Sequence, residues 1–110
     1  EQTTTSSRNE YVAMPVPYNG RVIKVVTRSE ERTDDTVVGF HKSSSGTEVP
    51  NTPATSSVTV AQAPDDTTFE YDFTNLDNTF VVGDIIAFSY EPTNPSYDTN
   101  VVVVLEYEVN

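Results

Sequence analysis

The C-terminal stretch alternates in polarity with a period of two, and this pattern constrains the fold more than any other feature. Every odd position in 101–109 is apolar. The even positions begin as Val102 and Val104 and end as Glu106 and Glu108. This is the spacing of a β-strand whose odd face is buried and whose even face passes into water. Because no other segment is as long or as regular, we expect a central strand of an all-β domain.

The rest of the chain also favours strands, since Thr and Val are abundant and no window has helical apolar spacing. In 21–28 the alternation places Ile23, Val25 and Thr27 on one face and Val22, Lys24 and Val26 on the other. Gly83-Asp84 predicts a kink, bulge or tight turn. We expect an antiparallel, jelly-roll-like β-sandwich of seven to nine short strands. The predicted strands are 10–14, 21–28, 36–42, 57–61, 67–74, 79–82, 85–90 and 101–109, with brief pairing at 47–49.

At 110 residues the chain has the size of one domain. Residues 1–9 are polar and without period, which is typical of an N-terminal arm or linker, and residues 10–110 form the predicted domain. Hydrophobic residues make up only 35% of the chain. We therefore expect a thin sandwich with long polar loops, which leaves room for further burial against a partner subunit.

The formal net charge of −11 limits the classes of partner. An acidic surface repels phosphate backbones and anionic lipid headgroups, so neither nucleic acid nor membrane is an expected partner. Such a charge favours solubility or, alternatively, adaptation to high salt. The chain has no cysteine, which excludes disulfide bonds and thiolate metal sites.

Catalytic residue patterns are scarce. His41 is the single histidine, and its place beside Phe40 predicts a surface or interface residue rather than a catalytic base. Glu106 and Glu108 share a face at an open strand end, where no apolar pocket is expected to raise the pKa of one of them, as glycosidase chemistry requires. We therefore expect no enzymatic activity, no catalytic residue and no cofactor.

Two kinds of ligand site remain as weaker hypotheses. Asp72, Asn75, Asp77 and Asn78 cluster in one loop and could bind calcium, but they lack the spacing of an EF-hand and are ordinary turn residues. Tyr18 and Tyr97 lie in loops, where a ring could stack on a sugar. The alternative for these tyrosines, and for Tyr11 and Tyr90, is that they seal the ends of the sandwich or a subunit interface.

Three motifs of the chain resemble small β-domains of tailed-bacteriophage virion proteins. The first lies in PYNGRVIKV, the second in FVVGDIIA and the third in DTNVVVVLE. The matching residues are Pro17, Gly20, Val22 and Val25, then Phe80, Gly83, Asp84 and Ile86, then Asp98, Asn100 and Glu106.

The resemblance implies a virion structural protein, either a capsid decoration protein or the knob of a head or tail fibre. It implies a homotrimer at the virion surface, with the major capsid protein and a host-surface glycan as further partners. We expect the subunit contact at Phe88, Tyr90, Val102 and Val104. The alternative function is a carbohydrate-binding module of a secreted or surface protein.

Overall fold

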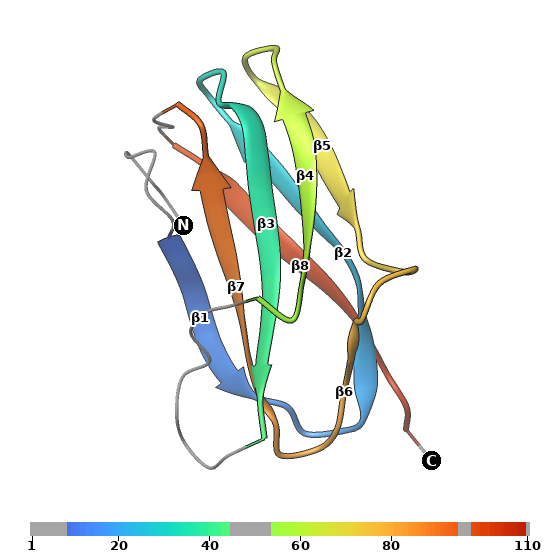
Figure 1. Ribbon diagram of the computed structural model, residues 1–110. Coiled ribbons are helices and arrows are strands. Elements are labelled where there is room, and N and C mark those ends of the chain that lie inside the picture. The colour runs from blue at the N-terminus through green and yellow to red at the C-terminus, as the bar shows by residue number, and fades with distance from the viewer. Residues whose placement is uncertain (1–8, 45–53, 95–97, 110) are drawn as a thin grey trace.

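The computed structural model describes residues 9–44, 54–94 and 98–109, and within these residues it contains eight antiparallel strands and no helix (Figure 1). The prediction of an antiparallel β-sandwich is confirmed. The predicted 47–49 pairing lies outside the described residues. The strands are β1 (Asn9–Pro15), β2 (Gly20–Ser29), β3 (Asp34–Ser43), β4 (Ser56–Gln62), β5 (Thr67–Asp72), β6 (Thr79–Phe80), β7 (Ile85–Pro92) and β8 (Asn100–Tyr107).

The strands form two sheets that face each other. Sheet A has the order β1-β7-β3-β4. In sheet B, β2 is the centre: β8 pairs along most of it on one side, while β5 and the short β6 pair with its two ends on the other. Among the residues that the structure describes, the C-terminal strand β8 pairs only with β2, so it lies at an edge and the prediction that it is a central strand is wrong. Alternation reports which face is buried, and it does not report how many neighbours a strand has.

A bulge in β2 corrects the predicted faces of that strand. The register with β8 shifts between Val22 and Lys24, so β2 carries one extra residue there. Val22 is consequently buried on the same side as Val25, and it does not share the outer face of Lys24. Asn78 holds the bulge through two hydrogen bonds of 2.8 Å: its side-chain Nδ2 donates to the Val22 carbonyl, and its backbone carbonyl accepts from the Val22 N–H.

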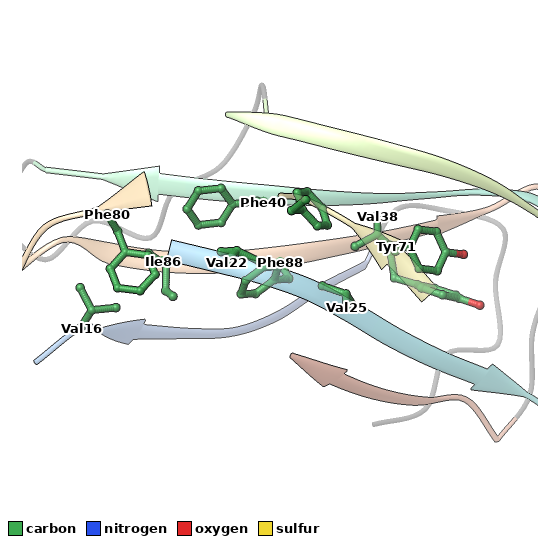
Figure 2. Close-up of a cluster of buried hydrophobic side chains, with 11 residues drawn as sticks. Val16, Val22, Val25, Val38, Phe40, Tyr71, Phe80, Ile86 and Phe88 are labelled. Carbon is green, nitrogen blue, oxygen red and sulfur yellow. The ribbon is translucent and has the colours of Figure 1, made fainter. Parts of the chain in front are cut away.

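Aromatic side chains fill much of the space between the sheets. Six of the eleven core residues are Phe or Tyr, and each aromatic ring buries more area than an aliphatic side chain. This explains how a chain with few hydrophobic residues closes a core. Figure 2 shows Phe80, Ile86 and Val16 together toward one end. The core residues are Val16, Val22, Val25, Val38, Phe40, Tyr71, Phe73, Phe80, Ile86, Phe88 and Tyr90.

A buried polar cluster around Gln62 joins the two sheets beside this core. The Gln62 Oε1 accepts hydrogen bonds from Thr27, at 2.7 Å, and from the Tyr71 hydroxyl. Its Nε2 donates to Thr33 at 2.7 Å and to the Tyr90 hydroxyl at 3.2 Å. Both ends of the amide are thus satisfied, which offsets the cost of burying them. Burial, followed by proximity to Tyr90, raises the pKa of Tyr71.

The Gly83-Asp84 signal corresponds to a tight turn between β6 and β7. The Asp84 N–H donates to the Val81 carbonyl at 3.0 Å, and Gly83 has a φ of 91°, which favours glycine. The buried Asp84 carboxylate accepts from the Val81 N–H at 3.0 Å. Two further bonds join Val16 to Gly83 and to Asp84, and they tie the turn to the end of β1. The prediction of a turn at this pair is confirmed.

Candidate functional site

The outer face of sheet B carries an apolar strip at its β8 edge. Val102 lies opposite Val26 of β2, and Val104 lies opposite Lys24. Val102 is 58% exposed, which is unusual for a valine in the middle of a strand. The odd-numbered side chains of β8 pack against the core and are only partly buried. The edge of the sandwich at β8 is therefore apolar on both faces.

Two of the four residues expected at a subunit contact do not lie on this surface. Phe88 and Tyr90 point between the sheets and are 5% and 1% exposed. A neighbouring subunit cannot reach them, because both side chains belong to the core between the sheets. The hypothesis therefore narrows to Val102 and Val104, and self-association through them stays a prediction.

Ion pairs surround the apolar strip on the same outer face. Arg21 Nε lies 2.8 Å from Glu106 Oε1, and Lys24 Nζ lies 3.0 Å from Glu70 Oε1. Such exposed pairs contribute little to stability. They do neutralise the charged groups nearest the valines, so the strip is a locally uncharged area on a strongly acidic chain.

Tyr18 lies in the connection between β1 and β2, close to the C-terminal end of β8. Tyr18 is 47% exposed, and its ring contacts Tyr107 edge-on, with 5.7 Å between the ring centroids. The next residue, Asn19, joins this connection to the β6–β7 turn and to the end of β8. It accepts hydrogen bonds from the N–H groups of Val82 and Glu108, both at 2.8 Å.

A pocket of about 290 Å³ opens at the same end, on the outer side of sheet B. Arg21 and two glutamates supply polar groups to it, which is compatible with hydroxyl binding. Tyr97, the second tyrosine of the sugar hypothesis, lies outside the described residues. The pocket is lined by Gly20, Arg21, Thr79, Glu106 and Glu108.

Three of the four residues of the calcium hypothesis take part in other interactions. Asn78 is buried against the bulge, and Asp77 Oδ1 lies 3.8 Å from Lys42 Nζ. Asn75 is exposed in the same turn. Asp72 binds Thr74, as an ordinary turn residue does. Within the part of the chain that the structure describes, no three His, Cys, Asp or Glu side chains are grouped so that they could hold a metal ion.

We expect the carboxyl group of Asp72 to titrate below its ordinary pKa of 3.8. The Thr74 hydroxyl and N–H donate to its Oδ1 at 2.7 and 2.9 Å and favour the charged form. Because the folded pKa is the lower one, this contribution to stability is present above the unfolded pKa. It is lost as the pH falls through the folded pKa.

NMR titration of the Asp72 carboxyl carbon checks that its pKa is lowered. The Thr74→Val variant should raise the pKa of Asp72 partway, since it removes the hydroxyl and keeps the N–H, while Thr79→Val should leave it unchanged. An unaltered Asp72 pKa in Thr74→Val would contradict the assignment.

His41 is buried, at 1% exposure, so the prediction of a surface or interface histidine is wrong. Its Nε2 lies 2.8 Å from Ser89 Oγ on β7. A nucleophilic serine and its base show the same contact, but Ser89 is only 5% exposed, so a substrate could not reach its hydroxyl. Gly39 makes this packing possible, because a Cβ there would lie 2.5 Å from Ser89 Oγ.

Acidic side chains gather at the opposite end of the sandwich. Glu30 has its pKa raised, first by the charge of Asp98 and then by a hydrogen bond to that residue. Asp66 and Glu31 act in the same direction. The carboxylates repel one another there, which is typical of a solvated end.

Comparison with protein-family models gave no match, and comparison with curated proteins gave none either. No helix in the described residues is long and apolar enough to span a membrane.

Proposed function

We propose that this chain is a non-enzymatic structural protein of a tailed-bacteriophage virion, acting as a homo-oligomer at the particle surface. It would decorate and stabilise the capsid or form the knob of a head or tail fibre. The observation that carries self-association is the apolar edge at β8, where Val102 is 58% exposed. The virion setting is supported by the resemblance of the three motifs.

The residues of the resemblance come together in space, which supports a shared architecture. Gly20 pairs with Phe80 of the second motif, and Arg21 pairs with Glu106 of the third. A rigid β-sandwich suits a role in which the protein supplies surface and contact rather than chemistry. The partners in this proposal are further copies of the chain and the major capsid protein.

Immunogold labelling of purified particles of the encoding phage tests the virion role. We expect gold on the head surface or at fibre tips, and the polypeptide should be found by mass spectrometry of the same particles. Particles that lack the chain after purification would overturn the proposal. The matched control is the same antiserum applied to particles of a deletion mutant.

A second function, carbohydrate binding, is favoured by one observation: Tyr18 is about half exposed, and its ring is held edge-on against Tyr107. Sugar rings stack on such aromatic faces while polar groups bind hydroxyls. Glycan-array binding that is lost in Tyr18→Ala and kept in Val82→Ala would support it. Binding by a chain that is absent from virions would favour a carbohydrate-binding module of a secreted or surface protein.

A further inference from the structure

The free edge of β8 lacks the features that usually prevent edge strands from pairing. Within the described residues, β8 forms a ladder with β2 alone. Residues 100–105 contain no charge, proline or glycine, and the bulge lies on β2. Natural edge strands are normally blunted by such features.

The other described edge strands expose polar side chains or contain a proline, although β4 (Ser56–Gln62) also has no charge, proline or glycine. The edge strand β4 presents Ser57 and Thr59 to solvent, β5 presents Glu70 and Asp72, and β1 ends at Pro15. The β8 edge is thus the one with exposed valine, and its core-facing side chains are only partly covered.

We propose that two copies of the chain pair antiparallel along β8, about a twofold axis at Val103, and join their B sheets into one continuous sheet. The inference rests on the self-association in the proposed function and names the surface that makes it. It replaces the trimer expected from the resemblance with a dimer or an assembly of dimers, because a strand that pairs with its own copy is closed by twofold symmetry.

The residue pattern of β8 matches this register. Opposed residues in antiparallel strands point to the same face, so Val102 meets Val104 of the second copy on the outer face. On the core face Val101 meets Leu105 of the second copy. At each end Asn100 meets Glu106 of the second copy, and an amide can donate to a carboxylate.

A second copy fits this edge because the contact avoids the charge of the chain. With a net charge of −11, two copies repel each other wherever acidic surfaces meet. In this register, paired residues 100–106 place no carboxylate opposite another, and Asp98 and Glu108, the next carboxylates that would face each other, lie beyond the ends of β8. Glu106 also keeps its ion pair with Arg21 of its own chain, 2.8 Å away on the β2 side.

Single-cysteine variants test the register directly, because the chain has no cysteine of its own. Opposed Cα atoms lie about 4.5–5.5 Å apart, which is inside the disulfide range of about 4.4–6.8 Å. A mixture of Val102→Cys and Val104→Cys should therefore cross-link on oxidation. Each variant alone should cross-link much less, since diagonal positions are about 7–8 Å apart.

The control is Ser57→Cys, an exposed position on the other sheet's edge strand β4. A mixture that cross-links no better than this control, or a Val102→Cys protein that cross-links equally well with itself, would overturn the register.

A charge at the strip gives a second, independent readout. By sedimentation equilibrium, Val102→Lys should raise the dimer dissociation constant at least about tenfold, equivalent to about 1.4 kcal/mol. The control Val82→Lys changes an equally exposed valine, 60% against 58%, in the β6–β7 turn and should leave the constant unchanged. Equal effects of both variants would contradict the inference.

The solution mass separates this inference from the proposed function. A dimer or an even-numbered assembly supports the β8 pairing. A trimer overturns the pairing and leaves the virion role standing. A monomer at micromolar concentration overturns both the pairing and the self-association.

Discussion

Replacing Gln62 with Ala is expected to lower the free energy of unfolding by about 3–5 kcal/mol, because several buried polar groups lose a partner at once. The substitution removes the acceptor of Thr27 and Tyr71 and the donor to Thr33. Each buried group left unsatisfied costs about 1–3 kcal/mol, and a cavity adds to this. Thr33 also forms a hydrogen bond with Thr36 at 2.8 Å, so the hydrogen bond that Thr33 loses in the variant is the most easily compensated.

Urea unfolding measures this loss, with Thr59→Ala as the control on an exposed position of the same strand. The control should change the free energy of unfolding by less than about 0.5 kcal/mol. Equal effects of the two variants would show that the cluster does not hold the sheets together.

The Gln62→Glu variant keeps the shape of the side chain and adds a pH readout. Burial would raise the pKa of the new carboxyl above its unfolded value of about 4.3. Because the pKa of this carboxyl is then higher in the folded than in the unfolded state, the variant is most stable at a pH below the unfolded pKa. Its stability should fall as the pH rises from the unfolded pKa to the folded pKa. Stability that increases with pH relative to the unmodified chain over this range would contradict the burial of position 62.

Replacing Gly20 with Ala is expected to destabilise the fold by about 3 kcal/mol, at the upper end of the usual cost of overpacking. A Cβ at this position would lie 2.3 Å from the backbone oxygen of Glu106 and 2.9 Å from Cε1 of the Phe80 ring. The oxygen belongs to β8 and cannot move away unless the ladder between Gly20 and Tyr107 opens. Thermal or urea unfolding measures the effect.

Gly83→Ala is the matched control, since it isolates the conformational effect from the steric one. Nothing lies within 4 Å of a Cβ at Gly83, while its φ of 91° strains any other residue. We expect a cost of about 1–2 kcal/mol there. A larger loss at Gly83 than at Gly20 would show that the close approach of β8 is not the constraint on Gly20.

Both glycines belong to the motifs that resemble virion domains, and each has a structural role. Gly20 allows β8 and Phe80 to approach β2, and Gly83 with Asp84 makes the turn into β7. The resemblance therefore describes how one end of this sandwich is built. The resemblance itself stays a prediction, and the function stays a proposal.

The outward direction of Val102 and the inward direction of Phe40 could be predicted from alternation alone. The burial of Gln62 could also be predicted, because position 62 follows Val58 and Val60 on the same inward face of the strand. The sequence does not show which groups a polar side chain at that position would bond to. Phe88 and Tyr90 alternate with Ala87 and Ser89, a pattern that is compatible with a buried apolar face. The structure places both side chains between the sheets, where they cannot form the expected subunit contact.

Strand positions and the all-β class followed from the sequence by itself, since the two-residue period and the turn residues act over a few neighbouring positions. Only the tertiary structure decided that β8 is an edge, that β2 bulges at Val22 and that Gln62 joins two sheets. Those features depend on contacts between segments far apart in the chain, such as residue 22 with residue 78. Pairing of this kind depends on which strand faces which, and local alternation is compatible with many such arrangements.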